Sequence, residues 1–397
     1  MIMPENDNRV PPRPPVVMQV LPSLVTGGVE RGTIDMAGSL RDAGWVPVVV
    51  SSGGPMVREL DRLGAEHILL PMQSKNPWVI RANIARLEQI IRARGVDIVH
   101  ARSRAPAWSA YYAAQRTGAH FITTYHGTYS HGPFGIKIPY NRIMTKGERV
   151  IAISQFIANH IQSVYRTDPA RVDVVHRGID IDRFDPQKVS QQRIIQLANR
   201  WRLPDGYAVV MLPARLTRWK GQEVLIDALA MLGRRDLRCL LVGSDQGRSA
   251  FNDELLAKVA RLGLTDIVHI VGDCNDMPAA YMLTDVVVSA STDPEAFGRV
   301  IVEAQAMGRP VIATDNGAAR ENLLDGQTGL LVPPRDPAAL ALALDRVLAI
   351  GPAERAERAD VAIDFVRRNF TREMMGARTL EIYGEVLGLT AVEPAAA

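Results

Sequence analysis

Two glutamates, Glu295 and Glu303, lie on either side of Gly298 in one short segment. Glycine lets the backbone approach a ligand closely, and the helix expected from Arg299 offers unpaired N–H groups to an anion such as a diphosphate. Carboxylates accept hydrogen bonds from hydroxyls, so both side chains suit a polyhydroxyl ligand. A helix-capping carboxylate followed by an exposed helix glutamate explains the segment equally well from the residues alone.

Two cations, Arg215 and Lys220, follow an expected strand at 208–212. Fixed cations at a strand end neutralise a diphosphate leaving group; Arg binds phosphate in bidentate fashion, and Lys acts as a point charge. Taken alone, this segment is more simply interpreted as a solvated turn.

Near the N-terminus, Gly27 and Gly28 join an expected strand at 16–21 to a helix around 30–42. Adjacent glycines permit close approach of the backbone to a phosphate or sugar, although many strand-to-helix turns contain such a pair. His126 follows the expected strand at 121–124 and precedes a glycine. A lone histidine is usually structural, but this position predicts a side chain at the carboxyl end of a sheet.

Short apolar strands alternate with amphipathic helices throughout the chain, which predicts an α/β protein with two doubly wound, Rossmann-like domains. Ligand sites in such domains lie at the carboxyl ends of the strands, so we expect the domains to face each other across a ligand cleft. The expected division is a disordered, Pro-rich lead-in at 1–15, an N-terminal domain at 16–185, a C-terminal domain at 186–365, and a helical segment at 366–390 that packs back on the first domain.

Composition limits the class of protein. The chain has 397 residues, of which 47% are hydrophobic and 22% charged, with a net charge of +3, too small an excess to indicate nucleic-acid binding. Cys239 and Cys274 form no metal-binding or disulfide pattern. The N-terminal segment lacks the apolar core of a signal peptide, and no apolar run is long enough to span a bilayer. We therefore expect a cytoplasmic protein, at most peripheral on the inner face of the cytoplasmic membrane.

The sequence from Glu295 onward, EAFGRVIVE, followed by AMGRPVIATDNGAARE and DGQTGLLVP, resembles retaining glycosyltransferases of family 4, which have the GT-B fold. The similarity extends over roughly residues 16–390 and is greatest to bacterial enzymes of lipopolysaccharide and other surface-polysaccharide biosynthesis. It implies a nucleotide-sugar donor, with UDP or GDP as the nucleotide, and a glycan or lipid-linked acceptor.

The resemblance also implies roles for individual residues. Glu295 would contact the donor-sugar hydroxyls and Glu303 the ribose, while Ala296, Phe297 and Gly298 would present backbone N–H groups. Arg215 and Lys220 would contact the donor phosphates, Gly28 would approach the donor, and His126 would contact the sugar or stabilise the transition state. The nucleotide base would lie near Gly243 and the turn at 271–277. Arg177 stands where the family commonly has Asn, which leaves its role open.

The resemblance therefore implies a hexosyltransferase that retains the anomeric configuration of the transferred sugar. The sequence contains no Asp-x-Asp motif and no metal-ligand cluster, so we expect metal-independent catalysis with no cofactor. Three alternatives remain open: a GT-B nucleotide-sugar epimerase, a bilobed sugar-binding protein, and a non-catalytic scaffold that binds sugar nucleotides.

Overall fold

A computed structural model describes residues 13–25, 27–245, 247 and 249–389 of the chain. The described residues divide into two compact units. Unit 1 comprises residues up to Ala152, Ile161–Asp173 and the residues from Gly376 onward; unit 2 comprises Ile153–His160 and Val174–Met375. The sequence predicts a domain boundary between residues 185 and 186. In the structure, the second unit begins at Val174 and also includes residues 153–160.

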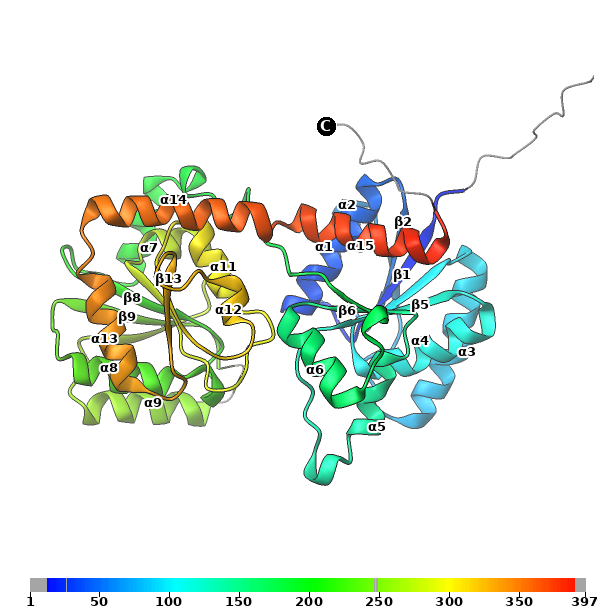
Figure 1. The fold of residues 1–397 in the computed structure, drawn as a ribbon, viewed down its shortest axis with the longest axis horizontal. Coiled ribbons are helices and arrows are strands. Elements are labelled where there is room, and N and C mark those ends of the chain that lie inside the picture. Colours follow the sequence, from blue (N-terminus) through cyan, green and yellow to red (C-terminus); the bar gives the residue numbers. More distant parts are fainter. Residues whose placement is uncertain (1–12, 26, 246, 248, 390–397) are drawn as a thin grey trace, which may run out of the picture. The chain divides into compact units, whose positions relative to one another are not determined.

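Unit 1 is built on a parallel sheet of seven strands (Figure 1). Its central strands are rich in valine and isoleucine and are buried, as expected for a sheet covered on both faces. The spatial order is β3 (Glu66–Leu69), β2 (Val46–Ser51), β1 (Val16–Val20), β4 (Ile98–Ala101), β5 (His120–Tyr125), β6 (Arg149–Ala152) and β7 (Val172–Val174).

The helices of unit 1 begin and end at recognisable capping residues. In α3, the Asn76 side chain accepts a hydrogen bond from the backbone N–H of Trp78, Pro77 opens the helix, and Gly95 closes it in the left-handed conformation. The α-helices are α1 (Gly28–Asp42), α2 (Val57–Leu63), α3 (Pro77–Arg94) and α4 (Arg104–Thr117), together with the parts of α6 (Gln155–Tyr165) from Ile161 onward and of α15 (Arg372–Leu387) from Gly376 onward. The short turns are η1 (Pro133–Gly135), α5 (Ile138–Asn141), η2 (Arg142–Thr145) and η3 (Pro169–Arg171).

A buried polar cluster joins the sheet of unit 1 to α15. The His100 ring on β4 hydrogen-bonds the Tyr383 hydroxyl at 2.5 Å and the Thr124 hydroxyl at 2.7 Å. Tyr383 also stacks on Trp45. Burial lowers the pKa of His100 well below its ordinary value, so the ring is neutral and the two hydroxyls satisfy its nitrogens. Through this cluster the part of α15 beyond Gly376 packs into unit 1.

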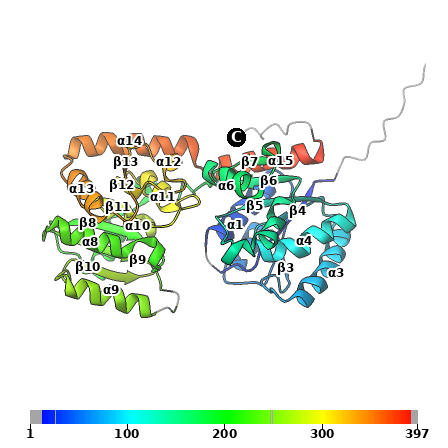
Figure 2. The same ribbon diagram turned by 60° about the horizontal axis from the view of Figure 1, so that its bottom comes forward.

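Unit 2 contains a parallel sheet of six strands (Figure 2). The order is β10 (Val268–Gly272), β9 (Leu237–Val242), β8 (Ala208–Pro213), β11 (Val286–Ser289), β12 (Val311–Thr314) and β13 (Gly329–Val332). Together, the two parallel sheets confirm the predicted doubly wound α/β class.

Helices cover both faces of the unit 2 sheet. On one face α8 lies against α13 and α9, and on the other α11 lies against α14 (Figure 1). The helices are α7 (Gln191–Arg200), α8 (Gln222–Leu232), α9 (Ser249–Arg261), α10 (Met277–Met282), α11 (Arg299–Ala306), α12 (Ala319–Asn322), α13 (Pro337–Leu348) and α14 (Pro352–Asn369), with turns η4 (Pro186–Lys188) and η5 (Arg218–Lys220).

The N-terminal half of α6, up to His160, belongs to unit 2, where Glu321 caps it. The Glu321 carboxylate accepts hydrogen bonds from the backbone N–H groups of Gln155 and Phe156, at 2.6 and 2.7 Å. The His176 ring lies 3.0 Å from the same carboxylate. Although burial acts in the opposite direction, these contacts lower the pKa of Glu321, so the ionised group compensates the N-terminal end of the helix.

Most of the predicted lead-in at 1–15 lies outside the described residues. Within the described part, Arg13 forms two hydrogen bonds with Asp97, at 2.8 and 2.9 Å. Among the described residues, no helix combines the length and apolar character that crossing a membrane requires.

Candidate active site

An ion pair lies at the carboxyl edge of the unit 2 sheet. Lys220 ends the turn after β8, and its ammonium group donates to the Glu295 carboxylate in the loop after β11. The Ser291 hydroxyl donates to the same carboxylate oxygen at 2.6 Å. Both charged side chains are largely buried, with 16% of Lys220 and 13% of Glu295 exposed. Two of the residues predicted as catalytic are therefore in direct contact, and Ser291, which the sequence analysis missed, orients the carboxylate.

The loops that carry this pair fit so closely that glycine is required at two positions. Gly221, at φ +73°, would place a Cβ atom 1.8 Å from the Ala290 carbonyl oxygen. Gly317, at φ +67°, would place one 2.2 Å from the Glu295 carbonyl oxygen, which also accepts the Ala318 N–H at 2.9 Å. Backbone packing thus fixes the position of the Lys220–Glu295 pair.

The segment Ala296–Gly298 turns into α11 with its carbonyl groups already bonded. The Ala296 carbonyl accepts the Ser154 hydroxyl at 2.7 Å, and the Phe297 carbonyl accepts the Asn322 side-chain amide. Gly298 adopts φ +82° immediately before the helix, and α11 has no side-chain cap. These carbonyl contacts fix the backbone orientation at the start of the helix, where N–H groups favour an anion.

Glu303 lies one turn further along α11 and is 9% exposed. Its carboxylate accepts the Tyr281 hydroxyl at 3.0 Å and pairs with Arg299 at 3.1 Å. Burial, together with the neighbouring carboxylate, raises the pKa of Tyr281 well above its ordinary value, so this hydroxyl stays protonated and donates. Glu303 is thus a fixed acceptor; its partner Tyr281 was not predicted from the sequence.

Arg215 lies beside a hollow at the carboxyl ends of β8, β9 and β10. Its side chain is exposed, and its carbonyl oxygen accepts the Gln222 side-chain amide at 2.9 Å. The hollow has a volume of about 370 Å³ and is lined by residues that include Gly243 and Asp273. A Cβ atom at Gly243 would lie 2.1 Å from the Ala214 carbonyl oxygen. The hollow therefore occupies the region where the sequence predicted the nucleotide base.

The remaining predicted site residues belong to unit 1. Gly28 is the first residue of α1, after Gly27 at φ +148°. His126 follows β5 and is partly buried. Gly28 and His126 thus lie in unit 1, whereas Lys220 and Glu295 lie in unit 2. Among the described residues, no group of three or more His, Cys, Asp or Glu side chains is arranged to hold a metal ion.

Comparison with known proteins identifies related sequences. Residues 26–183 match the family described as Glycosyltransferase Family 4, and residues 208–349 match Glycosyl transferases group 1. The D-inositol 3-phosphate glycosyltransferase of Salinispora tropica is 30% identical over 331 residues, which cover 77% of this chain and 67% of that protein.

Solved structures show the same relationship. A glycosyltransferase from Rickettsia africae is 39% identical, with a TM-score of 0.88 over 95% of this chain and 100% of that one. Anabaena HepE, crystallised with UDP and glucose, is 24% identical, with a TM-score of 0.81 over 93% of this chain and 99% of that one. The HepE similarity shows a shared fold.

Proposed function

Because the chain belongs to glycosyltransferase family 4 and is a glycosyltransferase with the GT-B fold, we propose that it transfers a hexose-type sugar from a nucleoside-diphosphate sugar with retention at the anomeric carbon and without a metal ion. One observation carries this proposal: the buried Lys220–Glu295 pair adjoins the start of α11. A cation and helix N–H groups suit a diphosphate, and a fixed carboxylate suits sugar hydroxyls.

Leaving-group stabilisation is the main catalytic contribution that we propose. Arg215, Lys220 and the start of α11 bind the diphosphate, which departs with the electron pair of the bond between the anomeric carbon and the phosphate oxygen. Positive charge then builds on the sugar, and the acceptor hydroxyl attacks from the same face. Its proton passes to an oxygen of the departing phosphate, so the step needs no further base. Fixed cations are effective here because they are already oriented when the charge develops.

The other assignments follow the geometry of each group. We assign Glu295 to the donor-sugar hydroxyls and Glu303 to the ribose hydroxyls. Ala296, Phe297 and Gly298 present backbone N–H groups, because their segment is anchored through its carbonyls.

In unit 1, we assign His126 to the sugar or its transition state and Gly28 to close approach of the donor. The 370 Å³ hollow takes the base, which we propose to be uracil or guanine. The UDP in HepE makes UDP the first nucleotide to test.

Two acceptor classes have support. The sequence resemblance favours a glycan or lipid-linked acceptor in lipopolysaccharide or other cell-envelope polysaccharide synthesis. The name of the Salinispora relative instead favours a phosphorylated polyol, since that protein is a D-inositol 3-phosphate glycosyltransferase. Both acceptor classes present a hydroxyl group, and both remain proposals for this chain.

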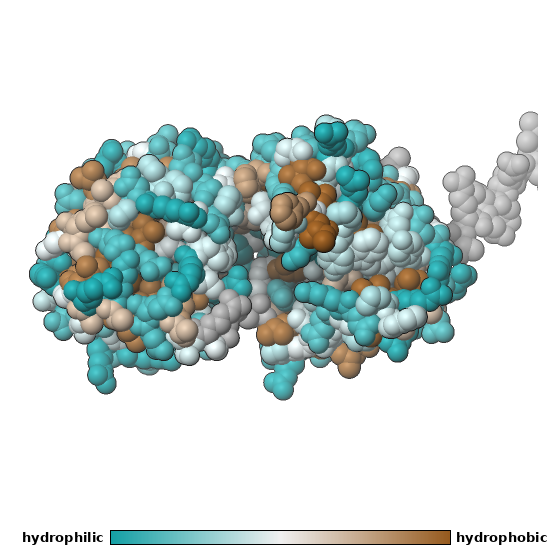
Figure 3. Space-filling view, turned by 90° about the horizontal axis from the view of Figure 1, so that it is seen from below, coloured by the Kyte–Doolittle hydropathy of each residue, from teal (hydrophilic) through white to brown (hydrophobic). Residues whose placement is uncertain are grey.

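A loop of unit 1 supports peripheral contact with the cytoplasmic face of a membrane. Phe134 is fully exposed and Ile136 is 74% exposed, and Figure 3 shows hydrophobic side chains on the face to which this loop belongs. Residues 127–147 contain no aspartate or glutamate but carry the exposed cations Lys137, Arg142 and Lys146. Apolar side chains among cations suit an anionic lipid surface.

The proposed transfer is tested by incubating the purified protein with UDP- or GDP-hexoses, first alone and then with candidate acceptors, including inositol 3-phosphate. We expect nucleotide release that depends on the acceptor and a product with the anomeric configuration of the donor sugar. Conversion of the donor without an acceptor would instead indicate an epimerase. Binding without turnover in the presence of every acceptor class would favour the scaffold, and an inverted product would contradict the mechanism.

A further inference from the structure

The turn after β8 places an aromatic ring beside the cation that we assign to the leaving group. The Lys220 ammonium nitrogen lies 4.2 Å from the centre of the Trp219 ring. The face of an indole ring carries negative electrostatic potential, which attracts a cation without neutralising its charge. Because the Lys220 side chain is largely buried, water competes little with this attraction. Lys220 thus has two kinds of partner, the Glu295 carboxylate and a neutral ring.

A carboxylate alone is enough to hold a largely buried lysine in unit 2. Lys258 on α9 is 13% exposed and pairs with Asp227 at 2.6 Å, and no aromatic ring lies over its ammonium group among the described residues. The Trp219 ring is therefore not needed simply to bury Lys220. What the ring adds is direction, because the four-carbon stem of a lysine is flexible and a ring on one side restricts where the ammonium points.

The backbone of Trp219 is fixed to the loop that carries Glu295. Its carbonyl oxygen accepts the Thr292 N–H at 2.7 Å and the Thr292 hydroxyl at 3.4 Å. Thr292 directly follows Ser291, whose hydroxyl donates to the Glu295 carboxylate. The ring and the carboxylate that share the ammonium are thus held in one frame of backbone contacts.

The residue before Trp219 anchors the other side of the turn. Arg218 pairs with Glu254 at 2.6 Å, and its guanidinium carbon lies 5.1 Å from the centre of the Phe251 ring. Both partners belong to α9. The turn that carries the Trp219 ring is therefore tied to α9 on one side and to the loop after β11 on the other.

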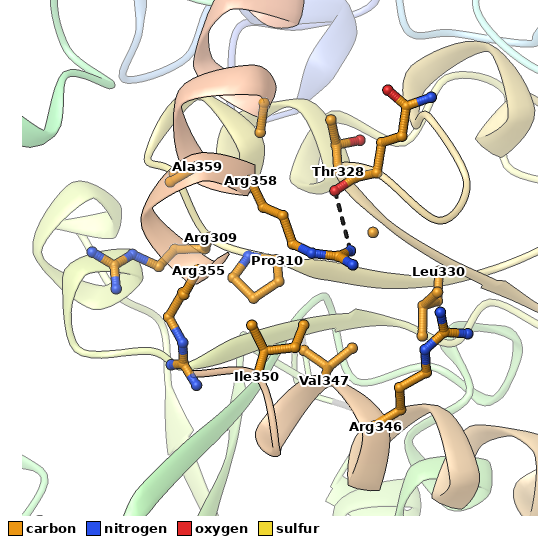
Figure 4. A pocket seen from close by; sticks show the side chains of 14 residues that line it. Arg309, Pro310, Thr328, Leu330, Arg346, Val347, Ile350, Arg355, Arg358 and Ala359 are labelled. Atoms are coloured by element: carbon orange, nitrogen blue, oxygen red, sulfur yellow. Dashed lines mark hydrogen bonds between the residues drawn. The ribbon is translucent and has the colours of Figure 1, made fainter. Parts of the chain in front are cut away.

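A cation at the opposite edge of the same sheet is held differently. There the Arg358 side chain lines a hollow between the amino ends of β12 and β13 and parts of α13 and α14 (Figure 4). All three of its nitrogen atoms are occupied, by the Glu354 carboxylate and by two backbone carbonyl oxygens at 3.0 and 3.4 Å. The three N–H groups of Lys220, in contrast, have one acceptor among the described residues, Glu295. Lys220 therefore keeps N–H donors for a ligand.

We propose that Trp219 is a positioning residue of the donor site, which keeps the Lys220 ammonium directed at the diphosphate while Glu295 binds the sugar. This role rests on the proposed transfer reaction. Sugar hydroxyls that donate to the Glu295 carboxylate compete with the ion pair, whereas the neutral ring continues to attract the ammonium. The cation is then already oriented when negative charge develops on the leaving phosphate.

Double-mutant cycles on the full chain test this role. Trp219→Leu removes the ring but keeps an apolar side chain, Trp219→Phe keeps a weaker aromatic face, and each is made in wild type and in Lys220→Ala. The matched control is Trp201→Leu, because Trp201 is another half-buried tryptophan of unit 2 and no cation lies over its ring among the described residues. The values of kcat and KM are measured for every protein, and calorimetric affinity for UDP and GDP gives the same comparison without turnover.

We expect Trp219→Leu to lower kcat/KM about 5- to 30-fold, the strength of one desolvated cation–π contact, with the larger part of the loss in kcat. Trp219→Phe should recover part of this loss. In the Lys220→Ala background, Trp219→Leu should change kcat/KM by less than about 2-fold, because the cation on which the ring acts is gone. Trp201→Leu should leave kcat/KM unchanged.

The role of Trp219 is overturned if Trp219→Leu lowers kcat/KM equally in both backgrounds, since the ring would then act on packing or on the ligand directly. Equal values for Trp219→Phe and Trp219→Leu, or a wild-type value for Trp219→Leu, would overturn it as well. These outcomes leave the proposed function standing. Wild-type protein that binds neither nucleotide and turns over no donor would instead contradict the proposed function, and this role with it.

Discussion

The two units present different carboxyl edges. In unit 2, Gly221 and Gly317 lock the loops together, and Ser291 and Lys220 hold Glu295 in place. In unit 1, the long segment after β5 instead carries an exposed phenylalanine and isoleucine among cations. The carboxyl edge of unit 2 is therefore held by a fixed set of backbone contacts. The carboxyl edge of unit 1 instead leaves exposed side chains that can contact an external surface. A fixed edge suits an invariant ligand part such as a diphosphate.

Removing Lys220, the buried cation at the carboxyl edge of unit 2, should have the largest effect on catalytic activity. Lys220→Ala deletes a charge aimed at the proposed leaving group, so we expect kcat/KM to fall about 10²- to 10³-fold. Steady-state kinetics with the identified donor measures this loss. Lys258→Ala is the control, since Lys258 is another largely buried lysine paired with a carboxylate, Asp227, at 2.6 Å. Equal kcat/KM values for wild type and Lys220→Ala would show that Lys220 does not contribute to catalysis.

The close backbone fit of unit 2 is tested by Gly221→Ala. A Cβ atom there collides with a carbonyl oxygen, while Gly263, at φ +66°, has no atom within 4 Å of its Cβ position. Gly263→Ala should cost about 1 kcal/mol from its left-handed backbone alone. Gly221→Ala should lower the free energy of unfolding by at least about 2 kcal/mol more, as measured by urea denaturation. Equal losses in the two variants would show that the overlap is relieved by small shifts.

The exposed loop of unit 1 should act on membranes rather than on stability. Replacing Phe134 and Ile136 together by alanine removes two apolar side chains, so we expect about 10-fold weaker binding to anionic vesicles in sedimentation assays. Trp78, which is 78% exposed outside this loop, provides the control Trp78→Ala. If the double variant binds vesicles as wild type does, the loop is not the membrane contact.

Within unit 1, the buried His100 should make stability depend on pH. Burial lowers the pKa of His100 in the folded protein, so the unfolded chain binds an additional proton below its own pKa of about 6.5. The free energy of unfolding should therefore fall below about pH 6.5, by up to about 1.4 kcal/mol per pH unit from this group. Urea denaturation at pH 7.5 and 5.5 should show a smaller fall for His100→Asn. An identical fall in both proteins would mean that His100 does not contribute.

That the residues of the proposed donor site lie at one edge of the unit 2 sheet was predictable, because they are clustered along the chain. Arg215 and Lys220 follow one strand, and Glu295 and Gly298 follow another, so local spacing places them at one edge of the sheet. Ser291 lies only four positions before Glu295, but serine at a strand end is too common to signal its role. Such partners became visible only in the folded structure.

Other features depend on contacts between distant segments. Tyr281 reaches Glu303 from a separate helix, and Ser154 reaches Ala296 from the start of α6. The same long-range packing explains the unit boundary: Glu321 caps α6, so residues 153–160 join unit 2 although no break in the sequence marks this change. The spacing of apolar residues predicts which face of a helix or strand is buried, but it does not predict which other segment packs against that face.

The central claim, that the carboxyl edge of unit 2 binds a nucleoside diphosphate, is tested most directly by calorimetric titration with UDP and GDP. We expect one of them to bind wild-type protein with one site per chain and to bind Arg215→Gln at least about 10-fold more weakly. Binding to Arg367→Gln, which changes an exposed arginine on α14, should be unchanged. Failure of both nucleotides to bind, or equal affinity in wild type and Arg215→Gln, would contradict the proposed donor site.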